Sequence, residues 1–184
     1  LMQVAPTALP GVLILEPMVY ADERGYFLES FNQRAFDAAV GYAVTFLQDN
    51  HSRSKRGVLR GLHYQLPPHA QGKLVRVVSG SVFDVAVDIR RGSVTFGRWA
   101  GVTIDAANQR QMWVPPGFAH GFLVVSVVAV FLYKETAYYA PEHERALKWD
   151  DPQLGIDWPL AGIAPIVSAK DAAAPPLAQA EHYP

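Results

Sequence analysis

Short runs of β-branched and aromatic residues recur along the chain and are separated by Gly, Pro and Asn. Runs of this length, with turn residues between them, are typical of strands in an antiparallel sandwich or barrel. The pattern therefore predicts an all-β fold. The predicted strands span residues 12–20, 44–50, 58–65, 73–80, 81–89, 99–104, 111–115, 121–126 and 128–139.

Two of these segments carry further expectations. The Ser-Gly-Ser link at residues 79–81 joins two predicted strands and is expected to form a tight hairpin. The segment 12–20 is long and apolar, and such a strand promotes aggregation at a sheet edge unless it is covered or paired. We therefore expect a homodimer in which this N-terminal region contributes to the interface.

Helix signals are few. Residues 34–40 are predicted to form a helix that Asn32 can cap, and a shorter helical turn is expected at residues 170–173. The tail from Leu160 onward is rich in Ala and Pro, so we expect it to wrap the surface as irregular coil.

The length and composition fit one domain. The chain has 184 residues, of which 50% are hydrophobic, and this is enough to bury one sizeable core. We therefore expect a single domain over residues 1–184, with an N-terminal strand region and a C-terminal tail around a barrel. The absence of cysteine excludes disulfides, thiolate nucleophiles and metals held by cysteine.

Charge and hydropathy argue against two classes of partner. The net charge is −1 and no basic stripe is present, so we expect no nucleic-acid partner. No apolar run approaches the roughly 20 residues that cross a bilayer, and the first residues lack the pattern of a signal peptide. We expect a cytoplasmic protein with no membrane partner. A small anionic ligand remains compatible, because single arginines can bind a phosphate.

Six separated segments stand in one order along the chain: DERGYFLESF (22–31), FLQDNHSRSKRGVLRGLHYQ (46–65), QGKLVRVVSGSVFDVAVDIR (71–90), VPPGFAHGF (114–122), LYKETAYYAPEHERALKWDDPQLGIDWP (132–159) and SAKDAAAPPL (168–177). Together they resemble the dTDP-4-dehydrorhamnose 3,5-epimerase family over nearly the whole chain. The resemblance implies a cupin-type double-stranded β-helix jelly roll that works as a homodimer without a metal or other cofactor. It also implies epimerisation of dTDP-4-keto-6-deoxy-D-glucose at C3 and C5, both beside the C4 carbonyl, to dTDP-4-keto-L-rhamnose.

Epimerisation beside a ketone needs a base, a group that stabilises the enolate and an acid on the opposite face. His63 is the candidate base, because an imidazole can be neutral and still basic at physiological pH; the competing interpretation is a buried strand histidine. Strict strand alternation places Arg60 and His63 on opposite faces. Both can face one pocket only if Gly61 marks a bulge or a twist.

Three further residues are assigned with this base. Asp171 resembles the family aspartate that hydrogen-bonds the histidine, although its spacing from Ser168 also fits a helix cap. Tyr133 is the candidate acid, a role that a nearby cation would assist by lowering its pKa; core packing is the alternative. Lys73 would face the C4 oxygen, or else be a solvated lysine. Asp84 is expected to pair with Lys73 or another neighbouring cation.

The resemblance also implies residues that bind the nucleotide and the sugar. Arg60 resembles a phosphate ligand, and the amides at positions 48 and 50 suit a pyrimidine edge or a sugar hydroxyl. His120, Tyr139, Glu144 and Lys170 are equally compatible with solvated surface positions. The expected substrate-binding residues are Arg24, Phe27, Glu29, Gln48, Asn50, Arg60, His120, Tyr139, Glu144 and Lys170.

Three alternatives stay open. Many cupins bind a metal through an HxH pair, but the corresponding segment reads His63-Tyr64-Gln65 and lacks the second histidine. A metal-dependent isomerase or oxygenase would have to use His63, His120 and His69 as its ligands. A chelator would inhibit such an enzyme. A related sugar-nucleotide enzyme could be a 3-epimerase, a 5-epimerase or a 3,4-ketoisomerase. A non-catalytic cupin would bind its ligand without exchanging protons with solvent.

Overall fold

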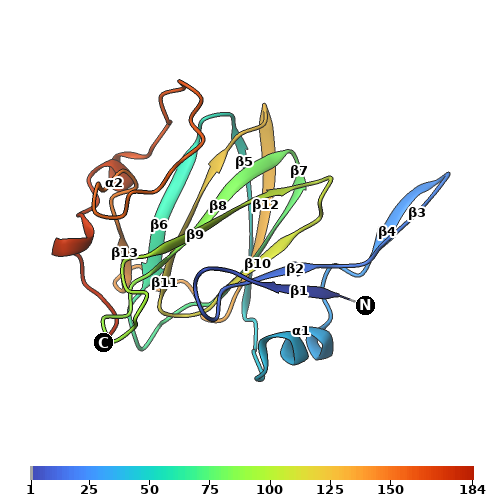
Figure 1. Cartoon of the computed structure of the whole chain (residues 1–184), viewed down its shortest axis with the longest axis horizontal. Coiled ribbons are helices and arrows are strands. Elements are labelled where there is room, and N and C mark those ends of the chain that lie inside the picture. Colours follow the sequence, from blue (N-terminus) through green and yellow to red (C-terminus); the bar gives the residue numbers. More distant parts are fainter. Residues whose placement is uncertain (1) are drawn as a thin grey trace.

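Two antiparallel sheets form the body of the protein in a computed structural model that describes residues 2–184 (Figure 1). The first sheet has the order β1-β2-β10-β7-β12-β5 and the second β13-β6-β11-β8-β9. From β5 to β8 and again from β9 to β13, consecutive strands alternate between the sheets, which gives the jelly roll that the family resemblance implied. The first sheet contains β1 (Gln3–Pro6), β2 (Leu13–Glu16), β5 (Gln48–Lys55), β7 (Lys73–Ser79), β10 (Gln111–Val114) and β12 (Val128–Glu135). The second contains β6 (Leu59–Gln65), β8 (Ser81–Asp88), β9 (Trp99–Asp105), β11 (Phe118–Val124) and β13 (Glu144–Ala146).

Three apolar clusters hold the layers together. The cluster between the sheets includes Val75 and Phe131 of the first sheet and Phe122 of the second. The outer face of the first sheet packs against helix α1 (Gln33–Val40) through Trp113 and other aromatic residues. The C-terminal segment covers the outer face of the second sheet (Figure 1).

The two predicted helices are present. Asn32 caps α1, because its side chain accepts a hydrogen bond from the N–H of Ala35 at 3.1 Å. The short helix α2 (Ala169–Ala172) follows Ser168, and a 3₁₀ helix at Leu177–Gln179 was not predicted. The rest of the tail is mostly irregular, as expected. None of the described helices is long and apolar enough to cross a membrane.

The link at residues 79–81 is not a hairpin. Strands β7 and β8 belong to different sheets, so the chain turns from one sheet to the other at this point. Gly80 allows the turn because its φ is +81°, in the left-handed region. The backbone of β12 also passes so close that a Cβ at Gly80 would lie 2.0 Å from the Val128 carbonyl oxygen.

The segment 12–20 is two strands rather than one. It is interrupted after β2, which lies inside the first sheet between β1 and β10, and continues as β3 (Val19–Asp22), which pairs only with β4 (Gly25–Leu28). Pro17 accounts for the interruption, because proline lacks the N–H that a ladder requires. The apolar part is therefore covered within the chain itself.

The other strands also differ in places from the prediction. Strands β1, β4 and β13 were not predicted, and the predicted strands at 44–50 and 128–139 are shifted or shorter.

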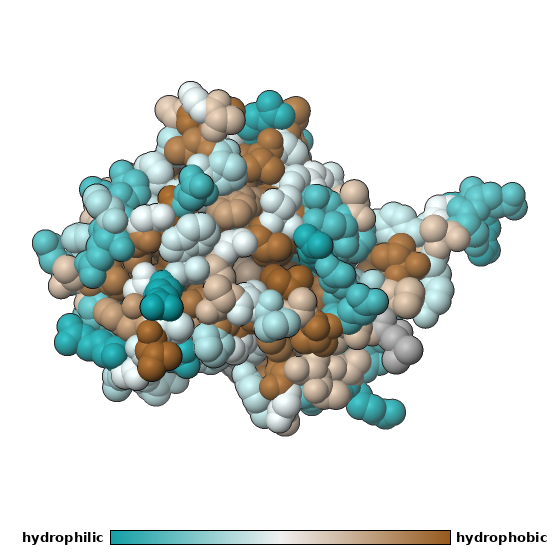
Figure 2. All heavy atoms as spheres, in the orientation of Figure 1, coloured by the Kyte–Doolittle hydropathy of each residue, from teal (hydrophilic) through white to brown (hydrophobic). Residues whose placement is uncertain are grey.

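The β3–β4 hairpin projects from the body (Figure 1). Figure 2 shows its hydrophilic tip standing away from the body, with hydrophobic residues nearer the base. Tyr26 and Phe27 are 60% and 69% exposed. A two-stranded hairpin is marginally stable by itself in water, so this exposed aromatic surface calls for a covering partner.

Replacing Gly80 with alanine should destabilise the fold strongly. We expect a loss of about 2–5 kcal/mol in the free energy of unfolding, from about 1–2 kcal/mol for the left-handed backbone and about 1–3 kcal/mol for overpacking against β12. Urea denaturation measures this change. Gly92→Ala is the matched control, because a Cβ at Gly92 meets nothing within 4 Å; it should change stability by less than about 0.5 kcal/mol. Equal effects of the two substitutions would contradict the packing argument.

Candidate active site

A cleft of about 430 Å³ opens between the inner faces of the two sheets. Strands β5, β7 and β12 of the first sheet and β6 of the second supply its walls, together with the segment before β13. Most of the sequence-predicted site residues meet here although they are distant in the chain. They are His63, Lys73, Tyr133, Arg60, Gln48, Asn50, Tyr139 and Glu144.

A bulge in β6 places Arg60 and His63 in the same cleft. The register between β6 and β11 shifts at this point, and Gly61 has φ +129°. A Cβ at Gly61 would lie 2.6 Å from the Cα of Gly121, so only glycine fits without displacing the neighbouring strand. The expectation that Gly61 breaks the strand alternation is confirmed.

His63 and Asp171 form a hydrogen-bonded pair. His63 Nε2 lies 2.6 Å from Asp171 Oδ1, while Asp171 Oδ2 accepts the Gly61 N–H at 3.1 Å. Burial raises the pKa of the Asp171 carboxyl, but the hydrogen bond and charge of His63 outweigh burial and leave that pKa below its ordinary value. An ionised carboxylate only accepts, so neutral His63 donates through Nε2 and keeps its lone pair on Nδ1. With 29% of its side chain exposed, this histidine can reach a ligand as a base.

The capping interpretation of Asp171 and its role beside His63 coexist. The Asp171 backbone N–H donates to Ser168 Oγ at 3.1 Å, which caps α2. The carboxylate is not used in this cap, because both of its oxygens bond elsewhere. Asp171 therefore takes part in the cap of α2 through its backbone and orients His63 through its side chain.

Lys73 faces the cleft with a buried side chain. Its side chain is paired with Glu135 at 3.7 Å and lies 5.6 Å from the centroid of the Tyr133 ring. Burial lowers the pKa of Lys73, and the negative charge of Glu135 opposes that shift. The alternative of a solvated lysine is wrong, since the residue is only 8% exposed.

Tyr133 differs from the sequence-based expectation in its pKa. Burial raises the pKa of the phenol, and the nearby charge of Glu135 raises it further. The expected lowering by a cation is therefore wrong, because burial and the anion outweigh the neighbouring cations. A phenol with a raised pKa stays protonated at neutral pH and is available as a proton donor.

Glu135 was missed by sequence reasoning. It lies two residues after Tyr133 on β12, so strand alternation places both on one face, and this was the available signal. Its Oε2 accepts hydrogen bonds from Gln48 Nε2 and Asn50 Nδ2, each at 2.9 Å. The carboxylate thus holds two predicted substrate-binding amides and balances the charge of Lys73.

Asp84 pairs with His120 rather than with Lys73. His120 Nε2 lies 2.6 Å from Asp84 Oδ1, and both side chains are buried. Burial raises the pKa of Asp84, although the charge and hydrogen bond of His120 oppose this. His120 sits opposite His63 in the strand register and stacks with Phe131 in the core, but it is not part of the cleft wall.

The rim of the cleft carries cationic groups. The Arg60 guanidinium donates to Ser54 Oγ at 3.2 and 3.1 Å, and within residues 2–184 it makes no ion pair. Lys170 donates to Glu144 Oε2, which also accepts from the Tyr139 hydroxyl at 2.8 Å. Arg60 is therefore the cation best placed to receive an anionic group of a ligand.

Three further predicted ligand residues, on or next to the β3–β4 hairpin, also lie outside this cleft. Arg24 is at the hairpin tip, where it pairs with Asp22. Phe27 and Glu29 line a separate cleft of about 350 Å³ between the hairpin and α1. Within one chain, therefore, these residues do not meet His63.

His63, His120 and His69, the ligand set of the metal-dependent alternative, do not form a group of neighbouring donor atoms among the described residues. In the part of the chain that the structure describes, one group of three metal-ligating side chains has its donor atoms close together, and it consists of His69, Glu142 and His143. His63 and His120 are not members, because each is paired with its own aspartate.

Comparisons with known proteins agree on one family. A family model described as dTDP-4-dehydrorhamnose 3,5-epimerase matches residues 6–179. The chain is 58% identical to the dTDP-4-dehydrorhamnose 3,5-epimerase of Pseudomonas aeruginosa over 183 residues, which cover 100% of each chain. It is also similar to the structure of dTDP-6-deoxy-D-glucose-3,5-epimerase from Legionella pneumophila in complex with dTDP-4-keto-L-rhamnose, with a TM-score of 0.94, 53% identity and coverage of 98% and 95%. A 3'-monoepimerase from Streptomyces bikiniensis, in complex with dTDP-quinovose, matches with a TM-score of 0.89, 38% identity and coverage of 94% and 87%.

Asp171→Asn should lower stability in a pH-dependent way. The pKa of Asp171 is depressed in the folded state, so its contribution is fully present above the ordinary value of 3.8 and is lost as the pH falls through the folded value. We expect a difference of about 1–3 kcal/mol from the unsubstituted protein at pH 7, which narrows below about pH 4. Urea denaturation at both pH values measures it. Asp150→Asn, at an exposed carboxylate, should cost less than about 0.5 kcal/mol at either pH; a difference for Asp171→Asn that widens in acid would contradict the assignment.

Proposed function

Because the chain belongs to the dTDP-4-dehydrorhamnose 3,5-epimerase family, we propose that its cleft converts dTDP-4-keto-6-deoxy-D-glucose to dTDP-4-keto-L-rhamnose by epimerisation at C3 and C5. The observation that carries this proposal is the meeting of an accessible, aspartate-bonded histidine with a buried lysine and a protonated tyrosine in one cleft. These are the base, enolate stabiliser and acid that the reaction requires.

The reaction begins with removal of a proton beside the C4 ketone. His63 takes the proton on Nδ1, and the resulting imidazolium is stabilised by the ionised carboxylate of Asp171. The electron pair of the broken C–H bond moves into an enolate whose negative charge develops on the C4 oxygen. The Lys73 ammonium is the cation suited to that charge, and the lower dielectric of its buried position strengthens the interaction.

Inversion then requires a proton from the opposite face. Tyr133 donates its phenolic proton to the carbon, the enolate returns to the ketone, and the phenolate is left beside Lys73. Solvent restores the proton to Tyr133 and removes one from His63, so atoms and charge balance after each turnover. Repetition at the second carbon completes the product.

The nucleotide diphosphate is bound at the rim of the cleft. Arg60, which has only a hydroxyl partner, is suited to a phosphate oxygen, and Lys170 lies at the rim through its bond to Glu144. Gln48 and Asn50 present amides on the wall. The cytoplasmic location expected from the sequence stays a prediction.

A second copy of the chain is proposed to cover the β3–β4 hairpin. The exposed aromatic residues of the hairpin and the displacement of Arg24, Phe27 and Glu29 from the cleft support this arrangement. In a homodimer, these residues would contact the nucleotide in the partner's cleft. The hairpin, rather than all of segment 12–20, supplies the interface.

Removing the base and removing the acid should have different effects on proton exchange. In heavy water, His63→Ala should lose both epimerisation and deuterium wash-in at C3 and C5, by at least about 10²–10⁴-fold. Tyr133→Phe should still wash deuterium into the substrate with retained configuration, because His63 can return a proton to the same face. NMR at both carbons follows each process and also distinguishes epimerisation at one carbon from epimerisation at both.

The same assay needs two controls. His182→Ala, a histidine away from the cleft, should keep normal exchange and turnover. The unsubstituted protein should stay active after exhaustive EDTA treatment, because the proposed steps use no metal. If His63→Ala exchanges deuterium as fast as the unsubstituted protein, the assignment of His63 as the base is wrong. If EDTA removes the activity and Zn²⁺ restores it, a metal-dependent mechanism is favoured.

Light scattering at micromolar concentration should report a dimer. Replacing Tyr26 and Phe27 together with serine should shift the protein toward the monomer, since this removes the exposed apolar surface of the hairpin. Tyr42→Ser is the matched control, because Tyr42 is 52% exposed but lies outside the hairpin. A monomeric unsubstituted protein, or a dimer that is unchanged by the double substitution, would refute this interface.

A further inference from the structure

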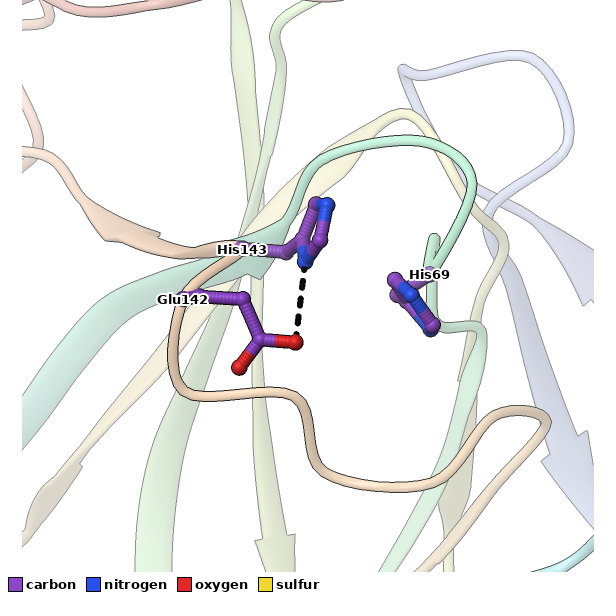
Figure 3. A group of neighbouring side chains, drawn as sticks. All are labelled: His69, Glu142 and His143. Atoms are coloured by element: carbon purple, nitrogen blue, oxygen red, sulfur yellow. Dashed lines mark ion pairs between the residues drawn. The ribbon is translucent and has the colours of Figure 1, made fainter.

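A second cluster of chemically active side chains lies outside the reacting groups of the cleft. His69 is in the loop between β6 and β7, and Glu142 and His143 are in the loop that leads from β12 to β13 (Figure 3). One donor atom from each of the three lies within 4.8 Å of the others. The two imidazole rings are 4.4 Å apart between centroids, and His143 Nδ1 is 3.4 Å from Glu142 Oε1.

Backbone hydrogen bonds fix the two loops relative to each other. The Leu66 N–H donates to the His143 carbonyl oxygen at 2.9 Å, which joins the loops directly. Each histidine is also held by its own loop: the His69 N–H bonds to Leu66 and the His143 N–H to Ala140. The Gln65 side chain donates to the His69 carbonyl oxygen at 2.7 Å. These hydrogen bonds hold the two loops together, so the backbone positions of the donor residues are fixed before any ion binds.

The donor set matches a borderline transition-metal ion. Two imidazoles and one carboxylate are characteristic ligands of Zn²⁺, and three protein ligands with an open fourth position form a complete site when solvent fills that position. His143 Nδ1 is buried and has no hydrogen-bond partner in the described chain. A cation would satisfy this nitrogen and replace the weak contact with Glu142.

We propose that His69, Glu142 and His143 form a surface site for a divalent transition-metal ion of the Zn²⁺ class. Ligand atoms at about 2.0–2.2 Å from such an ion stand about 3.3 Å apart in a tetrahedron, so the cluster must contract slightly on binding. The Glu142 side chain is 65% exposed and that of His143 29%, which leaves both free to make this adjustment.

The site lies next to the cleft, so a bound ion would restrain one wall of the cleft but would take no part in the chemistry. The loop from β12 to β13 carries Tyr139, and Glu144 follows the cluster directly; both line the cleft. A bound ion links this loop to the one after β6 and restrains that wall. The ion supplies nothing to the reacting carbons, because His63 is not among its ligands.

Zinc binding to EDTA-stripped protein tests the proposal directly. Titration calorimetry with ZnCl₂ should show one site per chain with micromolar or tighter affinity, and Co²⁺ in place of Zn²⁺ should give the visible absorption of a tetrahedral site. His69→Ala and His143→Ala should each weaken binding at least tenfold, and Glu142→Gln should weaken it less. His182→Ala, a histidine outside the cluster, should bind as the unsubstituted protein does.

A thermal shift provides a second measurement that does not depend on turnover. Zn²⁺ should raise the melting temperature of the unsubstituted protein and leave that of His69→Ala unchanged, while circular dichroism verifies that each variant is folded. Absence of binding at 100 μM Zn²⁺ would overturn the proposal. It would also be overturned by binding that persists in the His69→Ala/His143→Ala double variant or is lost in His63→Ala, since the ion would then sit elsewhere. None of these outcomes bears on the epimerase reaction, which deuterium exchange tests separately.

Discussion

The bulge at Gly61 is the constraint on which the active site depends. Its left-handed backbone and its close approach to Gly121 shift the register of β6, so that Arg60 and His63 face the same cleft. The Gly61 N–H, left without a regular ladder partner by this shift, is bound by Asp171. The same carboxylate bonds His63, the proposed base. One irregularity in a strand therefore turns the histidine toward the cleft and also binds the group that orients it.

Electrostatic balance in the cleft follows from this arrangement. Burial and the Glu135 carboxylate both favour the neutral, protonated phenol of Tyr133. At Lys73 they oppose each other, because burial favours the neutral amine and Glu135 favours the charged form. In the proposed reaction, Glu135 thus opposes the loss of charge from Lys73 and keeps Tyr133 protonated as a donor. Gln48 and Asn50 hold that carboxylate in place by hydrogen bonds, so two residues proposed to bind the substrate also position Glu135.

The rigid strands and the irregular segments have different roles. The residues proposed for the chemistry lie on β6, β7 and β12, whose positions are held by ladders and by a packed core. The contacts proposed for a nucleotide, a second subunit and a metal ion belong to the hairpin, the tail and the loops at the rim. This division agrees with the general need of a catalytic site for fixed geometry and of a binding surface for adjustment.

The sequence by itself determined the fold class, the cap of α1 and the family, and it proposed most of the residues that line the cleft. Alternating apolar residues specify strands locally, Asn32 acts on its own helix, and the six matching segments identify the family from residue types alone. Even the bulge could be predicted, because a glycine inside a strand, here between Arg60 and the Leu62-His63 pair, permits broken alternation.

Tertiary structure decided which groups meet and in which charge state. The link at residues 79–81 changes sheets instead of forming a hairpin, because the local chain has no information about which strand will be its neighbour. Asp84 lies opposite His120 for the same reason, and the pKa of Tyr133 rises because burial and the charge of Glu135 are properties of the assembled cleft. Residue types and local patterns are written in the sequence, whereas pairing, burial and the pKa values that follow from them depend on contacts between segments that only the folded chain brings together.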